Sequence, residues 1–190
     1  MQQTDLSSYN HNTYHPGAGR FKRALWFFTS ALLFKTSILP SSTIKVAILR
    51  LFGAKIGKQV VFRHAVNIKY PWHLTVGDHT WIGEKVWIDN LVTVHIGPNV
   101  CISQGAMLLT GSHNYKSPAF DLITGSIILH EGCWVGARAI INQGIEMSAH
   151  AVLSTGSIAT KNMDPYTIYQ GNPALKVRSR KMSPSQITFA

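Results

Sequence analysis

An apolar residue recurs in steps of about six along most of this chain, and this period restricts the fold more than any other feature. The repeated positions are Ile56, Phe62, Ile68, Val76, Ile82, Ile88, Ile96, Ile102, Leu108, Leu129, Val135, Ile141, Met147 and Leu153. A period of six fits neither the 3.6 residues of a helical turn nor the alternation of a strand. It is typical of a parallel β-helix in which each hexad forms one face and three hexads close a coil.

The hexads also predict what faces inward. Gly often follows the repeated apolar residue, and the fifth position is usually small or β-branched. We therefore expect a mainly β fold of about five coils over residues 56–158, with the first and fifth residues of each hexad inside. Gly or another small polar residue would ease the chain around each corner.

Departures from the strict period locate additions to the coils. Ile56, Val76 and Ile96 are twenty residues apart, so two residues are added at one corner of each early coil, whereas Leu129 and Met147 are eighteen apart. A longer insertion spans about 113–126. Because a solenoid stacks similar rungs, this insertion must leave the body as an external loop, and such loops often carry function.

Segments without the repeat flank it on both sides. We expect residues 1–55 to form an arm and helices, 56–161 the β-helix domain, and 162–190 a C-terminal loop and basic tail. Residues 20–35, here called the N-terminal segment, combine Arg and Lys with an apolar run of about eleven residues, too short to span a bilayer. A second helix is expected over 43–52, with a serine before it as its cap and Gly53 as its stop.

Two hypotheses for the N-terminal segment remain open. The segment can cover the open end of the β-helix as a helical cap. Alternatively it can lie in a membrane interface, with Trp26, Phe27 and Phe28 among the lipids and its cations on lipid phosphates. The two hypotheses are compatible in part.

The charge and the cysteine content limit the classes of binding partner that we expect. The net charge is +10, concentrated before Tyr70 and near the C-terminus. Such charge favours phosphate-bearing cofactors and anionic membrane surfaces, while the absence of a nucleic-acid-binding module argues against nucleic acid. Two cysteines without paired spacing, Cys101 and Cys133, favour reduced thiols in a cytoplasmic protein over a disulfide or zinc site.

Several motifs together resemble one known family. They are Leu51-Phe52-Gly53-Ala54-Lys55-Ile56-Gly57, Tyr70-Pro71-Trp72, Ser103-Gln104, Leu109-Thr110-Gly111-Ser112-His113, Trp134-Val135-Gly136-Ala137 and Gly171-Asn172-Pro173-Ala174. With the hexads, they resemble the hexapeptide-repeat acyltransferases, in particular the sugar O-acetyltransferases of colanic acid and related exopolysaccharide biosynthesis. The resemblance implies a left-handed parallel β-helix, a homotrimer, and acetyl-CoA bound in clefts between subunits.

His113 is the candidate catalytic residue. It opens the insertion, directly after Thr110-Gly111-Ser112. Acyl transfer to a hydroxyl needs a base that works near neutral pH, and imidazole suits this task. The family resemblance implies that a histidine at this place takes the hydroxyl proton, with direct transfer in a ternary complex.

The remaining candidate residues concern binding. The resemblance implies that Asn90, beside Asp89, contacts the acceptor sugar, although Asn is also an ordinary corner residue. It implies a CoA channel lined by Trp134, Ala137, Thr155, Thr160, Lys161 and Arg178. Lys161 and Arg178 suit the phosphates of CoA, because cations bind phosphate well.

These features favour an acetyl-CoA-dependent O-acetyltransferase that acts on a saccharide, free or carrier-linked, in the cytoplasm or at the inner face of the membrane. An O-acetyltransferase of a small xenobiotic such as an antibiotic is the second hypothesis for the acceptor. A non-catalytic β-helix scaffold would need neither the histidine loop nor the cationic tail. A zinc hydratase of the γ-carbonic anhydrase type needs three converging histidines, two of them five residues apart. No such pair lies near His113, so we expect no metal.

Overall fold

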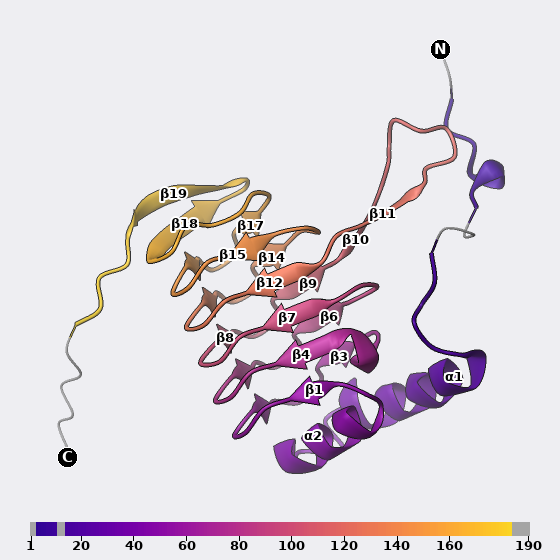
Figure 1. Ribbon diagram of the computed structural model, residues 1–190, viewed down its shortest axis with the longest axis horizontal. Helices are drawn as coiled ribbons and strands as arrows, with labels where there is room; N and C mark the ends of the chain where they lie inside the picture. Colours follow the sequence, from indigo (N-terminus) through magenta and orange to yellow (C-terminus); the bar gives the residue numbers. More distant parts are fainter. Residues whose placement is uncertain (1–2, 11–13, 184–190) are drawn as a thin grey trace.

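The computed structural model describes residues 3–10 and 14–183. Parts of the predicted arm (1–2 and 11–13) and the end of the predicted basic tail (184–190) lie outside the described residues. Residues 55–159 wind into a parallel β-helix whose coils stack in one column, with two helices at its N-terminal end and a hairpin projecting from one edge (Figure 1). The parallel β-helix predicted from the hexads is confirmed.

Three sheets form the faces of this column. Sheet A contains β1 (Lys55–Ile56), β4 (Leu74–Val76), β7 (Val94–Ile96), β12 (Ile127–Leu129) and β15 (Glu146–Met147). Sheet B contains β2 (Val61–Phe62), β5 (Trp81–Ile82), β8 (Cys101–Ile102), β13 (Trp134–Val135), β16 (Val152–Leu153), β18 (Thr167–Gly171) and β19 (Ala174–Ser179). Sheet C contains β3 (Asn67–Ile68), β6 (Trp87–Asp89), β9 (Met107–Leu109), β14 (Ile140–Ile141) and β17 (Ile158–Ala159). The strands of the three sheets are parallel except for β19, which pairs antiparallel with β18.

The repeated apolar residues form the core in the predicted register. In sheet A, for example, Ile56 pairs with Val76, which pairs with Ile96. All fourteen repeated positions are buried, and a buried aliphatic side chain contributes about 1.5–3 kcal/mol. Two fifth-position residues, Val92 and Ser112, are only partly buried. Both lie where the chain leaves sheet C by an enlarged connection.

The glycines that directly follow the repeated aliphatic residue act differently from the prediction, whereas Gly105, Gly132, Gly144 and Gly156 have the positive φ of a corner turn. Gly77 and Gly83 follow their aliphatic residue but do not have a positive φ. A Cβ on Gly77 would lie 2.5 Å from the backbone nitrogen of Pro98, so glycine is needed because the next coil packs against it. The left-handed turn falls two residues later and often carries a side chain, as at His79 (φ 57°) and Lys85 (φ 57°).

The N-terminal end of the column is closed by helices. They are α1 (Arg20–Thr29), a π-helical turn at Ser30–Phe34 and α2 (Ser42–Leu51). Trp26 is 3% exposed, and its indole N–H donates to the Ile68 carbonyl at 3.0 Å. The helix expected over 43–52 is confirmed within one residue, with the Ser41 hydroxyl as its N-terminal cap.

Side chains of α2 bond to the first coil. The Ser42 hydroxyl accepts from the Phe62 N–H at 2.8 Å, and the buried Lys45 ammonium donates to the Arg63 carbonyl at 2.7 Å. Burial lowers the pKa of Lys45. An open strand edge would leave such backbone groups without partners. α2 therefore covers this edge with hydrogen bonds as well as with apolar contacts.

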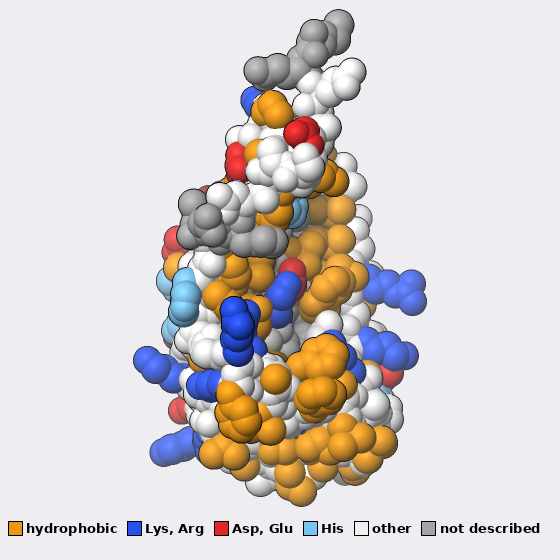
Figure 2. Space-filling model, turned by 90° about the vertical axis from the view of Figure 1, so that its right-hand side faces the viewer, with side chains coloured by type: hydrophobic (Ala, Val, Ile, Leu, Met, Phe, Trp, Pro, Cys, Tyr) orange, Lys and Arg blue, Asp and Glu red, His pale blue; other side chains and the backbone are white. Residues whose placement is uncertain are grey.

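The outer face of α1 stays apolar. Phe21, Leu25, Phe28 and Leu32 are spaced as one helical stripe, and all are exposed, Phe21 at 82% and Phe28 at 69%. Figure 2 shows hydrophobic side chains gathered at the lower end of the molecule, with Lys and Arg side chains on either side. Across the described residues, every helix falls short of the length and apolar character that crossing a bilayer requires.

The additions to the coils align along one edge, where sheet C leads into sheet A. A 3₁₀ turn at Pro71–His73 lies there, and the main insertion follows β9 at the same edge. This insertion is an antiparallel hairpin of β10 (Gly111–His113) and β11 (Leu122–Thr124), so it begins two residues before the expected 113–126. His113 consequently ends a strand.

The N-terminal arm, which includes a short 3₁₀ turn at Leu6–Ser8, runs along the same edge (Figure 1). The Asp5 N–H donates to the Pro118 carbonyl at 2.8 Å, and the Trp72 indole N–H donates to the Pro16 carbonyl at 2.7 Å. The described parts of the arm are thus attached to the connections that the edge carries. We call this edge, with its hairpin and turns, the C–A edge.

Candidate active site

His113 has a fixed orientation in the hairpin. Its Nδ1 lies 2.8 Å from the Phe120 carbonyl oxygen, and its ring stacks on the Phe120 ring with centroids 4.6 Å apart. Because a carbonyl oxygen only accepts hydrogen bonds, Nδ1 carries the proton of the neutral ring. Nε2 is then the nitrogen that can accept a proton, so this geometry suits a general base.

A pocket of about 520 Å³ adjoins His113 on the C–A edge. Tyr14, Tyr70 and Arg23 line it together with the hairpin. The Tyr14 hydroxyl donates to the Leu91 carbonyl at 2.9 Å, and burial raises its pKa well above the usual range, with Tyr70 and Asp89 adding to the effect. The pocket therefore offers hydrogen-bonding groups beside the imidazole, as a polyhydroxylated acceptor would require.

Asp89 lies in the wall of this pocket. Its Oδ1 is 3.0 Å from Nζ of Lys69, and both side chains retain partial exposure. An ion pair of this kind is worth about 0–1 kcal/mol, so the carboxylate can also accept a hydrogen bond from a ligand. The position of Asp89 is compatible with the predicted contact to an acceptor.

Asn90 occupies a different environment. Its side chain is 0% exposed; Oδ1 accepts from the Tyr70 N–H at 3.0 Å, and Nδ2 donates to the Tyr70 carbonyl at 2.6 Å. These two bonds hold the backbone of a pocket residue. A direct contact between Asn90 and an acceptor would require both bonds to break and the side chain to leave the interior.

Candidate cofactor residues gather on sheet B. Trp134, Thr155 and Arg178 line a pocket of about 320 Å³ beside β16 and β18. Trp134 is exposed, and its indole N–H donates to the Ser103 hydroxyl at 2.9 Å. Ala137 lies at the corner that follows β13. This groove combines an aromatic surface with a cation, which suits a nucleotide-bearing ligand.

The predicted cations differ in their surroundings. Arg178 is exposed on β19, whereas nearby Arg180 donates from Nη1 to the carbonyls of Gly132 and His150 at 2.9 and 3.1 Å. Arg180 is thus fixed by the protein and Arg178 is available to a ligand. Thr160 and Lys161 are exposed just after β17. They therefore lie on the C–A edge rather than on sheet B.

Within one chain, His113 and the predicted cofactor residues on sheet B do not lie together. Every coil runs from sheet A through sheet B to sheet C, and the hairpin leaves between sheets C and A. His113 thus lies at the edge opposite sheet B, in a different pocket from Trp134, Thr155 and Arg178. One described chain presents the histidine and most of the predicted cofactor residues on separate surfaces.

Sequence reasoning missed several residues around His113. Arg23, Lys69, Tyr70 and Tyr14 all line its pocket. The two-residue additions could have identified part of this set, because they mark the same edge as the main insertion and adjoin Lys69 and Tyr70. Nothing comparable in the sequence indicates Arg23 or Tyr14, which reach the pocket through the packing of α1 and the arm.

Metal and thiol chemistry find little support here. Within residues 3–10 and 14–183, no group of three or more His, Cys, Asp or Glu side chains is placed to hold a metal ion. Cys101 and Cys133 are unpaired. Burial raises the pKa of the Cys133 thiol to about 11, which keeps it protonated and unreactive.

Comparisons with known proteins agree with this architecture. The putative colanic acid biosynthesis acetyltransferase WcaF of Escherichia coli K12 is 35% identical over 176 residues, covering 93% of this chain and 97% of the relative. No protein-family model matches the chain.

Two solved structures share the fold. A maltose O-acetyltransferase from Clostridium difficile superposes with a TM-score of 0.79 at 20% identity, over 96% of this chain and all of the other. The hexapeptide-repeat acetyltransferase VCA0836 from Vibrio cholerae, complexed with acetyl-CoA, gives 0.77 at 22% identity, over 85% and 88% of the two chains. The shared fold is the left-handed parallel β-helix that the resemblance implied.

Proposed function

The chain belongs to the hexapeptide-repeat acetyltransferase family, and from this premise we propose that it transfers acetyl from acetyl-CoA to a hydroxyl of a saccharide used in exopolysaccharide biosynthesis. The observation that carries the proposal is the orientation of His113, whose Nδ1 bonds to the Phe120 carbonyl while its ring adjoins the pocket. The likeness to a colanic acid acetyltransferase over nearly its whole length supports the saccharide as acceptor.

His113 acts as a general base in this proposal. Nε2 accepts the proton of the acceptor hydroxyl as its oxygen attacks the acetyl thioester, and the protonated ring returns the proton to the departing thiolate. Hydrogen bonding to the Phe120 carbonyl keeps the ring oriented in both charge states. General-base catalysis of this kind contributes roughly 10²–10⁴-fold, and no covalent enzyme intermediate is needed.

Binding is divided among the other predicted residues. Lys161 and Arg178 hold the phosphates of CoA, and Trp134, Ala137, Thr155 and Thr160 line its path. Acetyl-CoA bound to the structurally similar Vibrio cholerae protein supports a cofactor channel on this fold. Asp89 receives a hydroxyl of the acceptor, while Asn90 contributes through the Tyr70 backbone that it holds.

The complete site requires a neighbouring subunit. His113 stands on the C–A edge, and Trp134, Thr155 and Arg178 stand on sheet B of the same chain. A cyclic trimer brings the C–A edge of one subunit against sheet B of the next, and repeats this contact three times. Light scattering on the purified protein is expected to give three times the chain mass of 21.0 kDa.

CoA release tests the activity itself. Purified protein is incubated with acetyl-CoA and each of a panel of exopolysaccharide repeat units, free and carrier-linked, with chloramphenicol as a representative small antibiotic. Acceptor-dependent CoA release with a saccharide is the expected result. If CoA is released with the antibiotic but with none of the saccharides, the acceptor is a small xenobiotic and not a saccharide. If the protein does not bind CoA at all, it is a non-catalytic scaffold.

We also propose that the cytoplasmic enzyme contacts the membrane through α1. The exposed stripe of Phe21, Leu25, Phe28 and Leu32 provides the apolar surface, and Arg20 and Lys35 stand near its ends. An interfacial helix gains from apolar burial and from roughly 1 kcal/mol for each cation near anionic lipid. Trp26, which the membrane hypothesis placed among the lipids, is buried and does not take part.

Point substitutions test this contact better than truncation. Trp26 and Phe34 pack in the core, so removing the segment would expose the first coil. Phe28→Ser with Leu32→Ser is expected to abolish co-sedimentation with phosphatidylglycerol vesicles at low salt. Leu175→Ser with Val177→Ser, exposed on β19 at the other end of the column, is the matched control. Equal sedimentation of both double variants would exclude α1 as the contact.

A further inference from the structure

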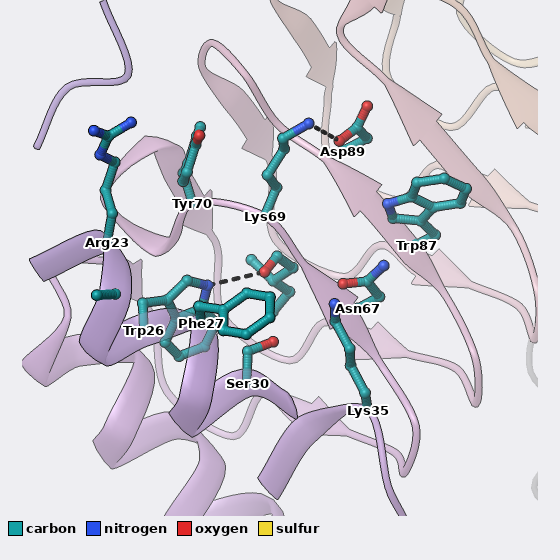
Figure 3. A pocket seen from close by; sticks show the side chains of 12 residues that line it. Arg23, Trp26, Phe27, Ser30, Lys35, Asn67, Lys69, Tyr70, Trp87 and Asp89 are labelled. Atoms are coloured by element: carbon teal, nitrogen blue, oxygen red, sulfur yellow. Dashed lines mark hydrogen bonds and ion pairs between the residues drawn. The ribbon is translucent and has the colours of Figure 1, made fainter. Parts of the chain in front are cut away.

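A second pocket lies beneath α1, and the proposed acetyl transfer uses only Asp89 and the Tyr70 backbone from its lining. It occupies about 500 Å³ between α1 with the π-helical turn on one side and strands β3 and β6 of sheet C on the other. Figure 3 shows side chains that line it from both sides, with Arg23 and Lys35 on the helical side and Lys69, which points toward Asp89, on the sheet side. Neither His113 nor the sheet B groove belongs to this pocket.

Positive charge dominates its lining. Arg23, Lys35 and Lys69 contribute three cations, and Asp89, paired with Lys69 at 3.0 Å, contributes the one carboxylate among the described lining residues. Cations that line one concave surface attract anions and can bind phosphate oxygens through charge-assisted hydrogen bonds. A carboxylate ligand would neutralise only one of the two excess charges, whereas a diphosphate matches both.

Two buried polar atoms in this lining have no partner in the described part of the chain. Ser30 is 3% exposed and its hydroxyl makes no hydrogen bond, and Nε of Arg23 is likewise unsatisfied. Leaving a buried donor unpaired is costly, so native proteins rarely keep such groups without a reason. Both groups can donate a hydrogen bond to an anionic oxygen in the pocket.

The pocket adjoins the one at His113. Arg23, Lys69, Tyr70 and Asp89 line both, so these residues form the wall that the two pockets share on the C–A side of the molecule. A ligand with one hydroxyl at His113 can therefore extend toward Ser30 and Lys35. Phe27 and Trp87 add apolar surface at that far end.

We propose that the pocket beneath α1 is a phosphate subsite for the acceptor, so that the substrate is a saccharide joined to its carrier through a diphosphate. This inference rests on the proposed acetyl transfer at His113. Arg23, Lys35 and Lys69 balance the phosphate charge, and Ser30 supplies a hydrogen bond. The carrier leaves the groove past Phe27, and both a nucleoside and a polyisoprenyl chain share this diphosphate chemistry.

Direct binding tests the subsite independently of turnover. Inorganic pyrophosphate is titrated calorimetrically into the full chain and into Arg23→Gln, Lys35→Gln and Arg178→Gln variants, with Lys58→Gln as a control for the loss of one exposed charge. Arg23→Gln and Lys35→Gln are expected to weaken binding about tenfold or more, and Lys58→Gln to leave it unchanged. Equal affinity in Lys35→Gln and wild type, or a loss confined to Arg178→Gln, would overturn the subsite.

Turnover then distinguishes the carriers. The same saccharide is offered free, as a nucleoside diphosphate conjugate and as a polyisoprenyl diphosphate conjugate. Lys35→Gln is expected to raise KM about tenfold for the preferred conjugate while KM for free saccharide and acetyl-CoA stays constant. The conjugate with the higher kcat/KM identifies the carrier.

These experiments distinguish failure of the phosphate subsite from failure of the proposed acetyl transfer. Acetylation that responds equally to Lys35→Gln with free and conjugated saccharide would remove the subsite and leave the proposed activity intact. Pyrophosphate binding that depends on Arg23 and Lys35, without acetylation of any saccharide, would remove the activity and leave an anion site.

Discussion

The C–A edge and sheet B differ in almost every physical respect. Sheet B is regular from β2 to β16, where parallel two-residue strands stack in register, and its outward surface carries Trp81 and Trp134. The C–A edge is irregular, because each early coil adds residues there and the hairpin with His113 leaves from it. The regular face offers a flat surface for a partner and a long cofactor, while the edge offers the polar groups that chemistry needs. Each surface is therefore expected to be incomplete alone.

The largest expected effect separates chemistry from cofactor binding. His113→Ala removes the base on the C–A edge and leaves sheet B unchanged, so turnover is expected to fall by roughly 10² or more while acetyl-CoA affinity stays the same. His95→Ala, an exposed histidine on β7, is the control. Steady-state kinetics with calorimetric CoA titration would check both, and near-normal turnover of His113→Ala would contradict the assignment.

Charge reversal addresses the cofactor residues. Lys161→Glu with Arg178→Glu is expected to raise KM for acetyl-CoA by at least about two orders of magnitude and to leave KM for the acceptor nearly constant, because each of the two lost charge-assisted phosphate contacts is worth about 1.5–3 kcal/mol. Lys55→Glu, exposed on β1, controls for net charge. An unchanged acetyl-CoA KM would show that Lys161 and Arg178 do not bind the CoA phosphates.

The smallest expected effect distinguishes two adjacent residues on the edge. Asn90→Ala removes both bonds to the Tyr70 backbone and is expected to lower the free energy of unfolding by about 1–3 kcal/mol. Asp89→Asn is expected to change stability by less than about 1 kcal/mol but to raise acceptor KM. Urea denaturation measures the stability of the two variants, and steady-state kinetics measures their acceptor KM. If Asn90→Ala is as stable as Asp89→Asn, the bonds from Asn90 do not stabilise the C–A edge.

The core could be predicted because it depends on local order. Each hexad determines which of its side chains face inward. The stacked coils repeat this pattern, so Ile56 in the first coil and Leu153 in the last are buried for the same reason. The role of the glycines that follow the aliphatic residue was predicted wrongly, because the sequence does not show how closely the next coil approaches Gly77. That approach is a property of stacking between residues about twenty apart.

The site could be predicted only in part. His113 was identifiable because an insertion interrupts the repeat beside it. The carbonyl of Phe120 that orients it, and the burial of Asn90, depend on how the hairpin and the Tyr70 connection fold. Arg23 enters the same pocket from α1, about ninety residues earlier in the chain, through packing that no local pattern records.

Complementation between two defective chains tests the central claim that the site is shared between subunits. His113→Ala has an intact sheet B, and the Lys161→Glu, Arg178→Glu variant has an intact histidine. When the two chains are co-expressed in equal amounts and all trimers are purified together, homotrimers included, random assembly should give about one quarter of interfaces that combine an intact histidine with an intact sheet B. Because Lys161 lies on the C–A edge, Arg178→Glu alone serves as the partner in a second mixture.

The measurement is acetyl transfer per subunit in this second mixture, compared with each variant alone at saturating acceptor and subsaturating acetyl-CoA. The account predicts activity near one quarter of wild type, well above the mean of the two single variants. Activity equal to that mean would contradict the account, because it would show that His113 and Arg178 serve the same site within one chain.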